Sequence, residues 1–510
     1  MSLTRRSLLR RGGVTAAGAA LVGAAAAPGA ARAQLGDDEA PNAVLVVLPL
    51  VRASHVNAFE GGSPADTPNL DDLTGDSLRF DRAIPESMPA LSVRRALVTG
   101  MRAFPFRDWR KTEGMPAVPG FNRIYDHQPV MTEVMRAGGV TTLYVSDNPM
   151  LDGARFPDVR RTRAISRTPA TPPGIDSELL PSFARASQAT ARTFRTGIRE
   201  LGALKRAEPF FLAIDPFEPA DAFEAPPVYV KPGEVDLEGV GPLNGRLVEL
   251  NFGDDDIDRV RKRYVEHVER VDEWVGRLMD AMADHDLLDD TVLYLLGDHG
   301  VSLGEHDYLG RATPTSHRLS YEVPYLIRHP SGEMAGDDVD WYASTHDVAP
   351  TLLSFMGLTI PGKMEGEDLT ALFDDVDEDD LRERPRSITA VGSCIIVRDS
   401  RWLMVADREE IERRLYDDDE EADDDNDAKR YDDVAGDEPG VLTELSITAL
   451  NAAGGTLPEF GPKGALRPPP QRGDDDTDDD GIPNDFDAVD NDEPDDDAEP
   501  ADLKFDGRNP

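Results

Sequence analysis

Residues 43–50 read AVLVVLPL, a continuous apolar run that decides the fold. Such an unbroken run is typical of a strand that is buried on both faces of a parallel sheet. Similar runs recur at residues 140–145, 209–214, 291–296 and 323–327. Because stretches with helical periodicity separate these runs, the alternation predicts an α/β/α sandwich around a mostly parallel central sheet.

The clearest helical pattern lies between residues 257 and 282. Its apolar side chains step along one face at intervals of three and four residues, as in an amphipathic helix. They are Ile257, Val260, Tyr264, Val268, Val271, Val275, Leu278 and Met282. We expect this helix to cover a sheet in which residues 43–50, 209–214 and 291–296 are neighbours.

Length and charge limit the classes of protein to consider. A chain of 510 residues is long enough for one large domain and a smaller one. The formal net charge of −44 argues against nucleic acid or anionic lipid as partners. Arginine exceeds lysine and aspartate is abundant, which fits a protein adapted to high salt. The single cysteine, Cys394, excludes an internal disulfide.

The N-terminal segment 1–33 has the features of a twin-arginine export signal. The pair Arg5-Arg6 precedes an apolar run, and small residues at 31–33 offer a cleavage site before Gln34. The run is short and rich in alanine, so we expect no integral membrane span after its removal. An uncleaved anchor is the alternative. The predicted location is extracellular or at the cell surface.

Three further units are expected along the chain. Residues 41–386 are expected to form the α/β domain. From about residue 387 the sequence pattern changes to short strand-like stretches, which predict a small antiparallel subdomain at 387–460. Its expected elements are two strand-like stretches and a helix, at residues 388–397, 402–406 and 441–450. The acidic tail, 461–510, has almost no large apolar residues and should not pack a core.

Four segments resemble the sulfatases of the alkaline phosphatase superfamily. They are TPNLDDLTGDSLRFDRA at 67–83, RRALVTG at 94–100, LGDHGVSLGEHDYLG at 296–310 and THDVAPTLL at 345–353. The resemblance implies an α/β/α sandwich with a small C-terminal antiparallel sheet and one helix. It also implies a sulfuric or phosphoric ester hydrolase that uses a metal ion and a covalent nucleophile. The expected ligand is a sulfated or phosphorylated glycan or a small ester.

The nucleophile of this family is replaced. Relatives place a cysteine, serine or threonine at a helix start, four residues before an arginine, where helix amides and the arginine stabilise ester oxygens. The matching arginine is Arg94, so the nucleophile position is Ala90. Ser92 lies roughly 200° further round the helix, and the direction of Ser87 cannot be read from sequence. Loss of the nucleophile costs on the order of a millionfold in turnover.

The metal ligands are also reduced. In sulfatases the first strand end supplies acidic ligands, whereas this chain has Pro49 and Leu50. At the second strand end, Asp298 and His299 remain. A hard dication such as Ca²⁺ takes about six to eight oxygen ligands, so these residues alone do not support a core divalent metal site.

Other interpretations of these residues stay open. Asp147 or Asp215 could complete a rebuilt metal site, or Asp298 and His299 could simply bond the loop backbone. Arg311 and His317 match the position of basic residues that contact the ester oxygen in the family, and the alternative is that they are solvated. Arg94 could equally be a buried arginine paired with an acid.

The tail contains a second metal motif. Residues 476–487 fit a twelve-position calcium loop with a glycine at its sixth position, and resemble the repeats of thrombospondin type 3 modules. The predicted Ca²⁺ ligands are the side chains of Asp476, Asp478, Asp480, Asn484 and Asp487 and the carbonyl of Ile482. A solvated acidic segment without bound ion is the alternative.

The sequence therefore predicts an exported sulfatase-like protein whose ester hydrolysis is lost or severely reduced. One alternative is an active sulfatase or phosphoesterase with a rebuilt metal site, using Ser87 or an activated water. The other is a non-catalytic cell-surface or glycan-binding protein.

Overall fold

The computed structural model describes most of the chain. The described residues are 41–59, 61–88, 90–106, 124–125, 127–146, 161–164, 182–216, 245–246, 254–305, 308–310, 321–373, 384–391, 394–407, 412–417, 433–455, 460–461 and 465–466. The predicted export segment, the tail calcium loop, and Asp147, Arg311 and His317 lie outside these residues.

An eight-stranded sheet runs through the centre of the molecule in the order β12-β2-β11-β8-β1-β6-β4-β5. Only β11 is antiparallel to its neighbours in this sheet; the remaining pairs are parallel. The bounds in that order are Asp338–Ala343, Leu78–Ala83, Tyr325–Arg328, Thr291–Gly297, Asn42–Leu48, Phe210–Asp215, Thr141–Ser146 and Arg161–Ala164. The predicted mostly parallel sheet is confirmed.

The first apolar run forms the central strand, β1. It pairs with β6 on one side and β8 on the other, so that Val44 lies opposite both Leu212 and Leu293. Every residue of these strands is buried. Because side chains alternate along a strand, Val44 joins one hydrophobic core and Leu45 the other. The predicted adjacency and two-sided burial of the three runs are confirmed.

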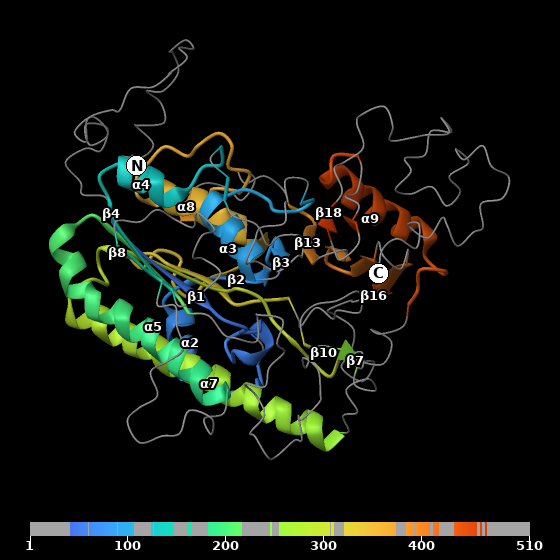
Figure 1. The fold of residues 1–510 in the computed structure, drawn as a ribbon, viewed down its shortest axis with the longest axis horizontal. Coiled ribbons are helices and arrows are strands. Elements are labelled where there is room, and N and C mark those ends of the chain that lie inside the picture. The colour runs from blue at the N-terminus through green and yellow to red at the C-terminus, as the bar shows by residue number, and fades with distance from the viewer. Residues whose placement is uncertain are drawn as a thin grey trace, which may run out of the picture.

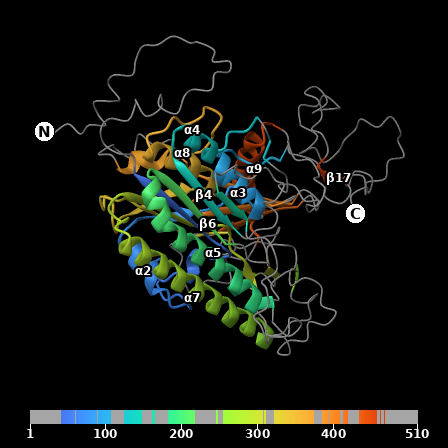
Figure 2. The same cartoon turned by 60° about the vertical axis from the view of Figure 1, so that its left-hand side comes forward.

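Helices cover both faces of the sheet (Figures 1 and 2). One face carries α2, α5 and α7, which are Pro68–Gly75, Ser182–Leu204 and Asp254–Asp284. The other carries α3, α4 and α8, which are Ala90–Thr99, Met131–Ala137 and Val348–Phe355. The apolar stripe expected between residues 257 and 282 is the buried face of α7. The predicted α/β/α sandwich is therefore confirmed.

Shorter elements complete the main body. A three-stranded sheet has the order β7-β10-β9, with bounds Gly245–Arg246, Tyr308–Gly310 and Ser302–Leu303. The short 3-10 helices are η2 (Ala53–His55), η4 (Lys205–Ala207), η9 (Thr345–Asp347) and η10 (Leu369–Phe373).

A second sheet has the order β16-β15-β14-β13-β3. Its antiparallel part comprises β13 (Ser387–Val391), β14 (Cys394–Arg398), β15 (Trp402–Asp407) and β16 (Glu412–Asp417). The interpretation of residues 388–397 as one strand was wrong, because β13 and β14 pair as a hairpin. The boundaries predicted for the separate units stay a prediction.

The fifth strand of this sheet comes from the N-terminal half of the chain. It is β3 (Ser87–Met88), which pairs in parallel with β13. Helix α9 (Pro439–Ala452) packs against the sheet through Leu445 and Ala449. A small hairpin of β17 (Phe460–Gly461) and β18 (Ala465–Leu466) follows.

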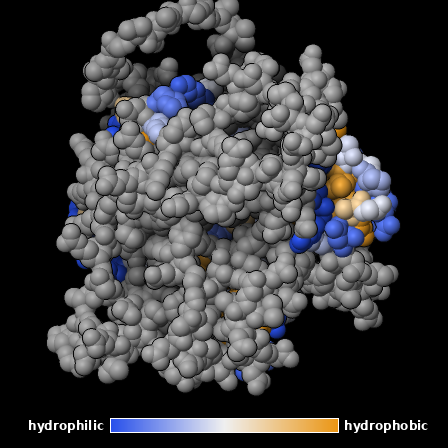
Figure 3. All heavy atoms as spheres, turned by 45° about the vertical axis from the view of Figure 1, so that its right-hand side comes forward, coloured by the Kyte–Doolittle hydropathy of each residue, from blue (hydrophilic) through white to orange (hydrophobic). Residues whose placement is uncertain are grey.

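Large apolar side chains are rarely exposed among the described residues. Figure 3 shows small apolar areas among polar ones on the face that it presents. Ile447 on α9, at 51% exposure, is the exposed large hydrophobic side chain among the described residues. None of the described helices is long and apolar enough to cross a membrane.

Candidate functional site

The candidate site lies at the carboxyl edge of the central sheet, where open α/β sheets carry their sites. Strands β1 and β8 end side by side, with Leu48 opposite Gly297. Pro49 and Leu50 follow β1 directly, and Asp298 and His299 follow β8. The structure thus brings together the two places that the sequence singled out.

The Asp298 carboxylate joins three segments of the chain. Its Oδ1 accepts hydrogen bonds from the backbone N–H groups of Leu50 and His299, at 2.8 Å each. Its Oδ2 accepts a hydrogen bond from Nη1 of Arg94 at 3.1 Å. Nδ1 of His299 donates to the carbonyl of Gly300 at 2.7 Å. Both side chains therefore bond the nearby loop backbone, which is one of the alternatives that the sequence left open.

Arg94 on α3 lies between two carboxylates and is fully buried. Its Nε is 2.9 Å from both carboxylate oxygens of Asp215, and its Nη2 is 2.7 Å from Oδ1. Asp215 is the last residue of β6 and is itself fully buried. The Tyr144 hydroxyl, from β4, donates to Oδ2 of Asp215 at 2.7 Å. The guanidinium is thus held in a bidentate pair with one acid while it also bonds the second, Asp298.

Burial dominates the electrostatics of this cluster. It raises the pKa of Asp215, against the opposing effect of the Arg94 charge, and the negative charge of Asp298 raises it further. Burial and the neighbouring Asp215 also raise the pKa of the Tyr144 hydroxyl well above its ordinary value. Tyr144 therefore remains protonated and serves as a hydrogen-bond donor.

The turn after β1 is held by helix α7. Leu50 has a φ of +57°, which costs roughly 1–2 kcal/mol for a residue with a β-carbon. The Tyr264 hydroxyl donates to the Leu50 carbonyl at 2.7 Å, and Nε2 of His267 donates to the Pro49 carbonyl at 2.9 Å. The backbone N–H of Arg52 in turn donates to the Tyr264 hydroxyl at 2.9 Å. These bonds keep the strained turn in place.

Arg52 ties the loop after β1 to the loop after β8. Its Nε donates to the Val301 carbonyl at 2.6 Å, and its Nη1 pairs with Glu305 at 2.9 Å. Burial alone would raise the pKa of Glu305, but the Arg52 charge and hydrogen bonds outweigh it and lower the pKa to about 2. Burial lowers the pKa of His55, in the same loop, to about 3.

Gly297 allows these loops to approach closely. A β-carbon on this residue would lie 2.7 Å from Cβ of Val323 and 2.9 Å from the Val51 carbonyl oxygen. Such contacts are too short to form without displacement of the backbone. The position immediately before Asp298 therefore requires glycine.

The residues that the structure describes do not fit a divalent metal at this edge. Among them, no group of three or more His, Cys, Asp or Glu side chains is placed to hold an ion. The family resemblance places two acidic ligands directly after β1, but this chain has Pro49 and Leu50 at those positions. The nearby carboxylates of Asp215 and Asp298 are both paired with the guanidinium of Arg94.

The nucleophile segment forms the start of α3. The helix begins at Ala90, so that position and Arg94 are about one helical turn apart. Ser92 is fully buried, and its hydroxyl has no hydrogen-bond partner among the residues that the structure describes. Ser87 is fully buried in β3 and lies opposite Ala390 in the second sheet. Each serine is thus part of the packed interior.

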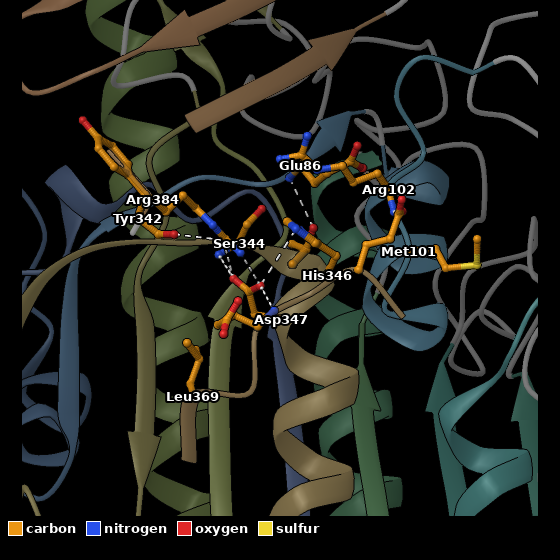
Figure 4. Close-up of polar contacts among 12 residues, drawn as sticks. Glu86, Met101, Arg102, Tyr342, Ser344, His346, Asp347, Leu369 and Arg384 are labelled. Atoms are coloured by element: carbon orange, nitrogen blue, oxygen red, sulfur yellow. Dashed lines mark hydrogen bonds and ion pairs between the residues drawn. The ribbon is translucent and has the colours of Figure 1, made fainter. Parts of the chain in front are cut away.

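A second polar cluster, around Asp347, was missed by the sequence analysis (Figure 4). The buried carboxylate of Asp347 accepts hydrogen bonds from the backbone N–H groups of Ser344 and Glu367, at 2.8 Å each. It also accepts two from Arg384, at 2.7 and 2.8 Å. Although burial favours its protonated form, Arg384 and these bonds lower the pKa of Asp347. The cluster fixes the point where the chain enters the second sheet.

The segment around β3 is attached to the same cluster. The Thr345 hydroxyl accepts the backbone N–H of Glu86 at 3.3 Å, and the Glu86 carboxylate accepts those of Ala103 and Phe104 at 2.9 Å. Burial lowers the pKa of His346 to about 3. One sequence signal could have revealed the Asp347 cluster. A serine three residues before an acidic residue, ahead of an apolar run, is a helix-capping pattern. Ser344 and Asp347 form this capping box in the structure.

Comparison with known proteins agrees with this architecture. The family model described as Sulfatase matches residues 41–358. An arylsulfatase of Clostridium perfringens is 25% identical over 33% of this chain, and an N-acetylglucosamine-6-O-sulfatase of Bacteroides thetaiotaomicron is 33% identical over 21%. These alignments span 38% and 19% of the two relatives.

Solved structures share the fold over most of their length. The phosphonate monoester hydrolase of Agrobacterium radiobacter superposes with a TM-score of 0.62 at 18% sequence identity. The superposition covers 81% of this chain and 95% of that structure. At this identity the likeness establishes the fold alone.

Proposed function

Because the chain belongs to the sulfatase family, we propose that it is a member in which ester hydrolysis by the family mechanism is lost or severely reduced. The observation that carries this proposal is the commitment of Arg94 to Asp215 and Asp298. An arginine that stabilises an ester must direct its N–H groups at sulfate or phosphate oxygens. Here Nε, Nη1 and Nη2 each bond a carboxylate of the protein itself.

The start of α3 supports the same conclusion. Its first residue, Ala90, has no group that can attack an ester. Loss of a nucleophile reduces turnover by on the order of a millionfold, and groups that act as a unit lose their effects together. The buried hydroxyls of Ser87 and Ser92 do not replace it, because an ester would have to enter the packed interior to reach them.

The absence of a metal-ligand group among the described residues also supports the proposal. A bound ion would polarise the ester and lower the pKa of the attacking group. The turn that would supply its acidic ligands has Pro49 and Leu50 instead, and Tyr264 and His267 bond the backbone carbonyls of these two residues. No reaction step is therefore assigned to an ion at this site.

Turnover of aryl sulfate and aryl phosphate by the purified full chain tests the proposal. We expect no hydrolysis above background with Mg²⁺, Mn²⁺ or Ca²⁺, and no change on addition of chelator. The matched control is Asp298→Ala, prepared in parallel, which reveals activity from contaminating enzymes. Turnover that disappears both with chelator and in Asp298→Ala would instead establish a working hydrolase with a rebuilt site.

For a non-catalytic role, we propose a short sulfated saccharide as the ligand class. The support is that a relative is an N-acetylglucosamine-6-O-sulfatase, while the net charge of −44 would repel a long polyanion. Thermal shift with glucosamine 6-sulfate, with glucosamine as control, tests this. Equal melting temperatures with both sugars would count against it.

We also propose export by the twin-arginine route and calcium binding by residues 476–487. The support is the pair Arg5-Arg6 before an apolar run, and oxygen-bearing residues at the spacing of a calcium loop.

A further inference from the structure

We propose that the guanidinium of Arg94 takes the place of the family's metal ion, and that its removal converts the pocket into a divalent-cation site. The inference rests on family membership and deepens the proposed function. It is tested by stability, however, and not by turnover.

The central strands explain why a cation is needed at this point. Strands β6 and β8 flank β1, and Asp215 ends one while Asp298 follows the other. Both carboxylates are shielded from solvent, with exposures of 0% and 2%. Two buried negative charges repel each other, and burial strengthens this repulsion. A positive charge between them removes the conflict.

Arg94 supplies that charge from α3. Three oxygens of the two acids lie 2.7–3.1 Å from its nitrogens. The Pro216 carbonyl is a weaker fourth acceptor, 3.4 Å from Nη2. Several oxygens from separate strands thus converge on one cation, as they would around a metal.

The same oxygens are the ligands that a hard dication prefers. Mg²⁺ and Ca²⁺ bind carboxylate and carbonyl oxygens at about 2.0–2.6 Å, which is shorter than any contact to the guanidinium. Because the guanidinium already lies among these oxygens, we expect an ion and Arg94 to exclude each other at this point. Once the side chain is truncated, Asp215, Asp298 and Pro216 surround a space that an ion and its waters can occupy.

Thermal unfolding of the full chain, in chelator and in 5 mM Mg²⁺ or Mn²⁺, tests the inference. We expect the melting temperature of the unmodified protein to be the same in both. Arg94→Ala should melt several degrees lower in chelator and recover a large part of that loss with Mn²⁺. All variants carry the same acidic tail, so an effect of ions on the tail is common to them and cancels in the comparison.

Two controls separate charge from packing. Arg52→Ala removes another buried arginine, which pairs with one acid among the described residues, Glu305. This variant should be less stable than the unmodified protein but should not respond to Mn²⁺. The variant Arg94→Ala/Asp215→Asn/Asp298→Asn removes all the charges together and should be more stable in chelator than Arg94→Ala. It should also not respond to metal.

The outcomes are distinct. If Arg94→Ala is unfolded in chelator, dialysis into Mn²⁺ should refold it, and failure to refold while the neutral triple variant folds would overturn the latent site. A triple variant no more stable than Arg94→Ala would show that packing, not charge, is the role of Arg94. If the unmodified protein were less stable in chelator than in Mg²⁺ or Mn²⁺, the inference that Arg94 takes the place of the metal ion would be wrong. Ester turnover would overturn the proposed function but not this comparison.

Discussion

Nε2 of His267 lies 2.9 Å from the carbonyl oxygen of Pro49. The contact joins α7 to the turn after β1, where the family resemblance places acidic metal ligands. Burial lowers the pKa of His267 to about 4, so the ring is neutral near pH 7 and its N–H donates to the carbonyl. In this chain the turn is therefore fixed through its backbone, and the side chains of Pro49 and Leu50 carry no donor atom for an ion.

Rescue of hydrolysis should require several changes together. Ala90→Thr alone should give no measurable turnover, because Leu50 and Pro49 provide no charge to hold an activating ion. Activity should appear only when Pro49→Asp and Leu50→Asp are added, since nucleophile and metal act as a unit. Aryl sulfate turnover of the single and combined variants measures this, with Ser92→Ala as a control that should change nothing. Substantial activity of Ala90→Thr by itself would contradict the account.

Acid should destabilise the fold through buried neutral histidines. The pKa values of His55, His267 and His346 are lowered from 6.5 to about 3, 4 and 3. Below pH 6.5 the unfolded chain binds protons that the folded chain does not, so stability falls from there down to the folded pKa values. The loss is about 1.4 kcal/mol per histidine per pH unit.

Urea unfolding at pH 7.5, 6.5 and 5.5 measures this dependence. His267→Gln keeps a donor for the Pro49 carbonyl but cannot titrate, so its stability should fall less steeply with acid. Identical slopes for the variant and the unmodified chain would mean that His267 is not protonated differently in the two states.

Gly297→Ala should destabilise the protein by about 1–3 kcal/mol, as overpacking of a filled interior does. The added methyl would meet Val323 and the Val51 carbonyl within 3 Å. Gly75→Ala is the matched control, because its added methyl would meet no such neighbour within 4 Å. Chemical denaturation of both variants checks the prediction. Equal stabilities would show that the loops after β1 and β8 can separate without loss.

Export should depend on the paired arginines. Changing both Arg5 and Arg6 to lysine should trap the precursor inside the cell, because the guanidinium pair is read by a receptor. Cell fractionation, followed by N-terminal sequencing of the exported protein, measures this, and the mature chain should begin near Gln34. Normal secretion of the double variant would argue for another route.

The tail should bind calcium weakly. A peptide of residues 474–492 should take up Ca²⁺ at sub-millimolar to millimolar affinity, as extracellular modules do. Titration calorimetry measures the affinity, and the same peptide with Asp480→Ala is its control. Equal heats from both peptides would make the motif an accident of acidic composition.

The sequence was sufficient for the central sheet because two-sided burial requires unbroken apolar runs, as in β1. It was insufficient for β3, since a strand of only Ser87 and Met88 has no periodicity to detect. It also joined β13 and β14 into one stretch, because both strands are apolar and only two residues separate them in the sequence.

The candidate site was predicted in part for a similar reason. The position after a buried strand is readable, so Pro49 and Asp298 were located correctly at one edge. The sequence did not show that Asp215 pairs with Arg94. The acid that reaches this arginine depends on which strand ends lie together in space. The contribution of Tyr144 from within β4 has no local signal at all.

The parallel pairing of β3 with β13 has a consequence for the order of assembly. Ser87 and Met88 reach their partners, Ala390 and Val391, across about three hundred residues of chain, and pairings at such separation form slowly. During synthesis, the segment leading into α3 therefore has no strand partner until about three quarters of the chain has been made. Ribosome-bound chains truncated before Ser387 should leave Met88 and Val93, which share a core with Ile396 and Leu403, accessible to chaperones.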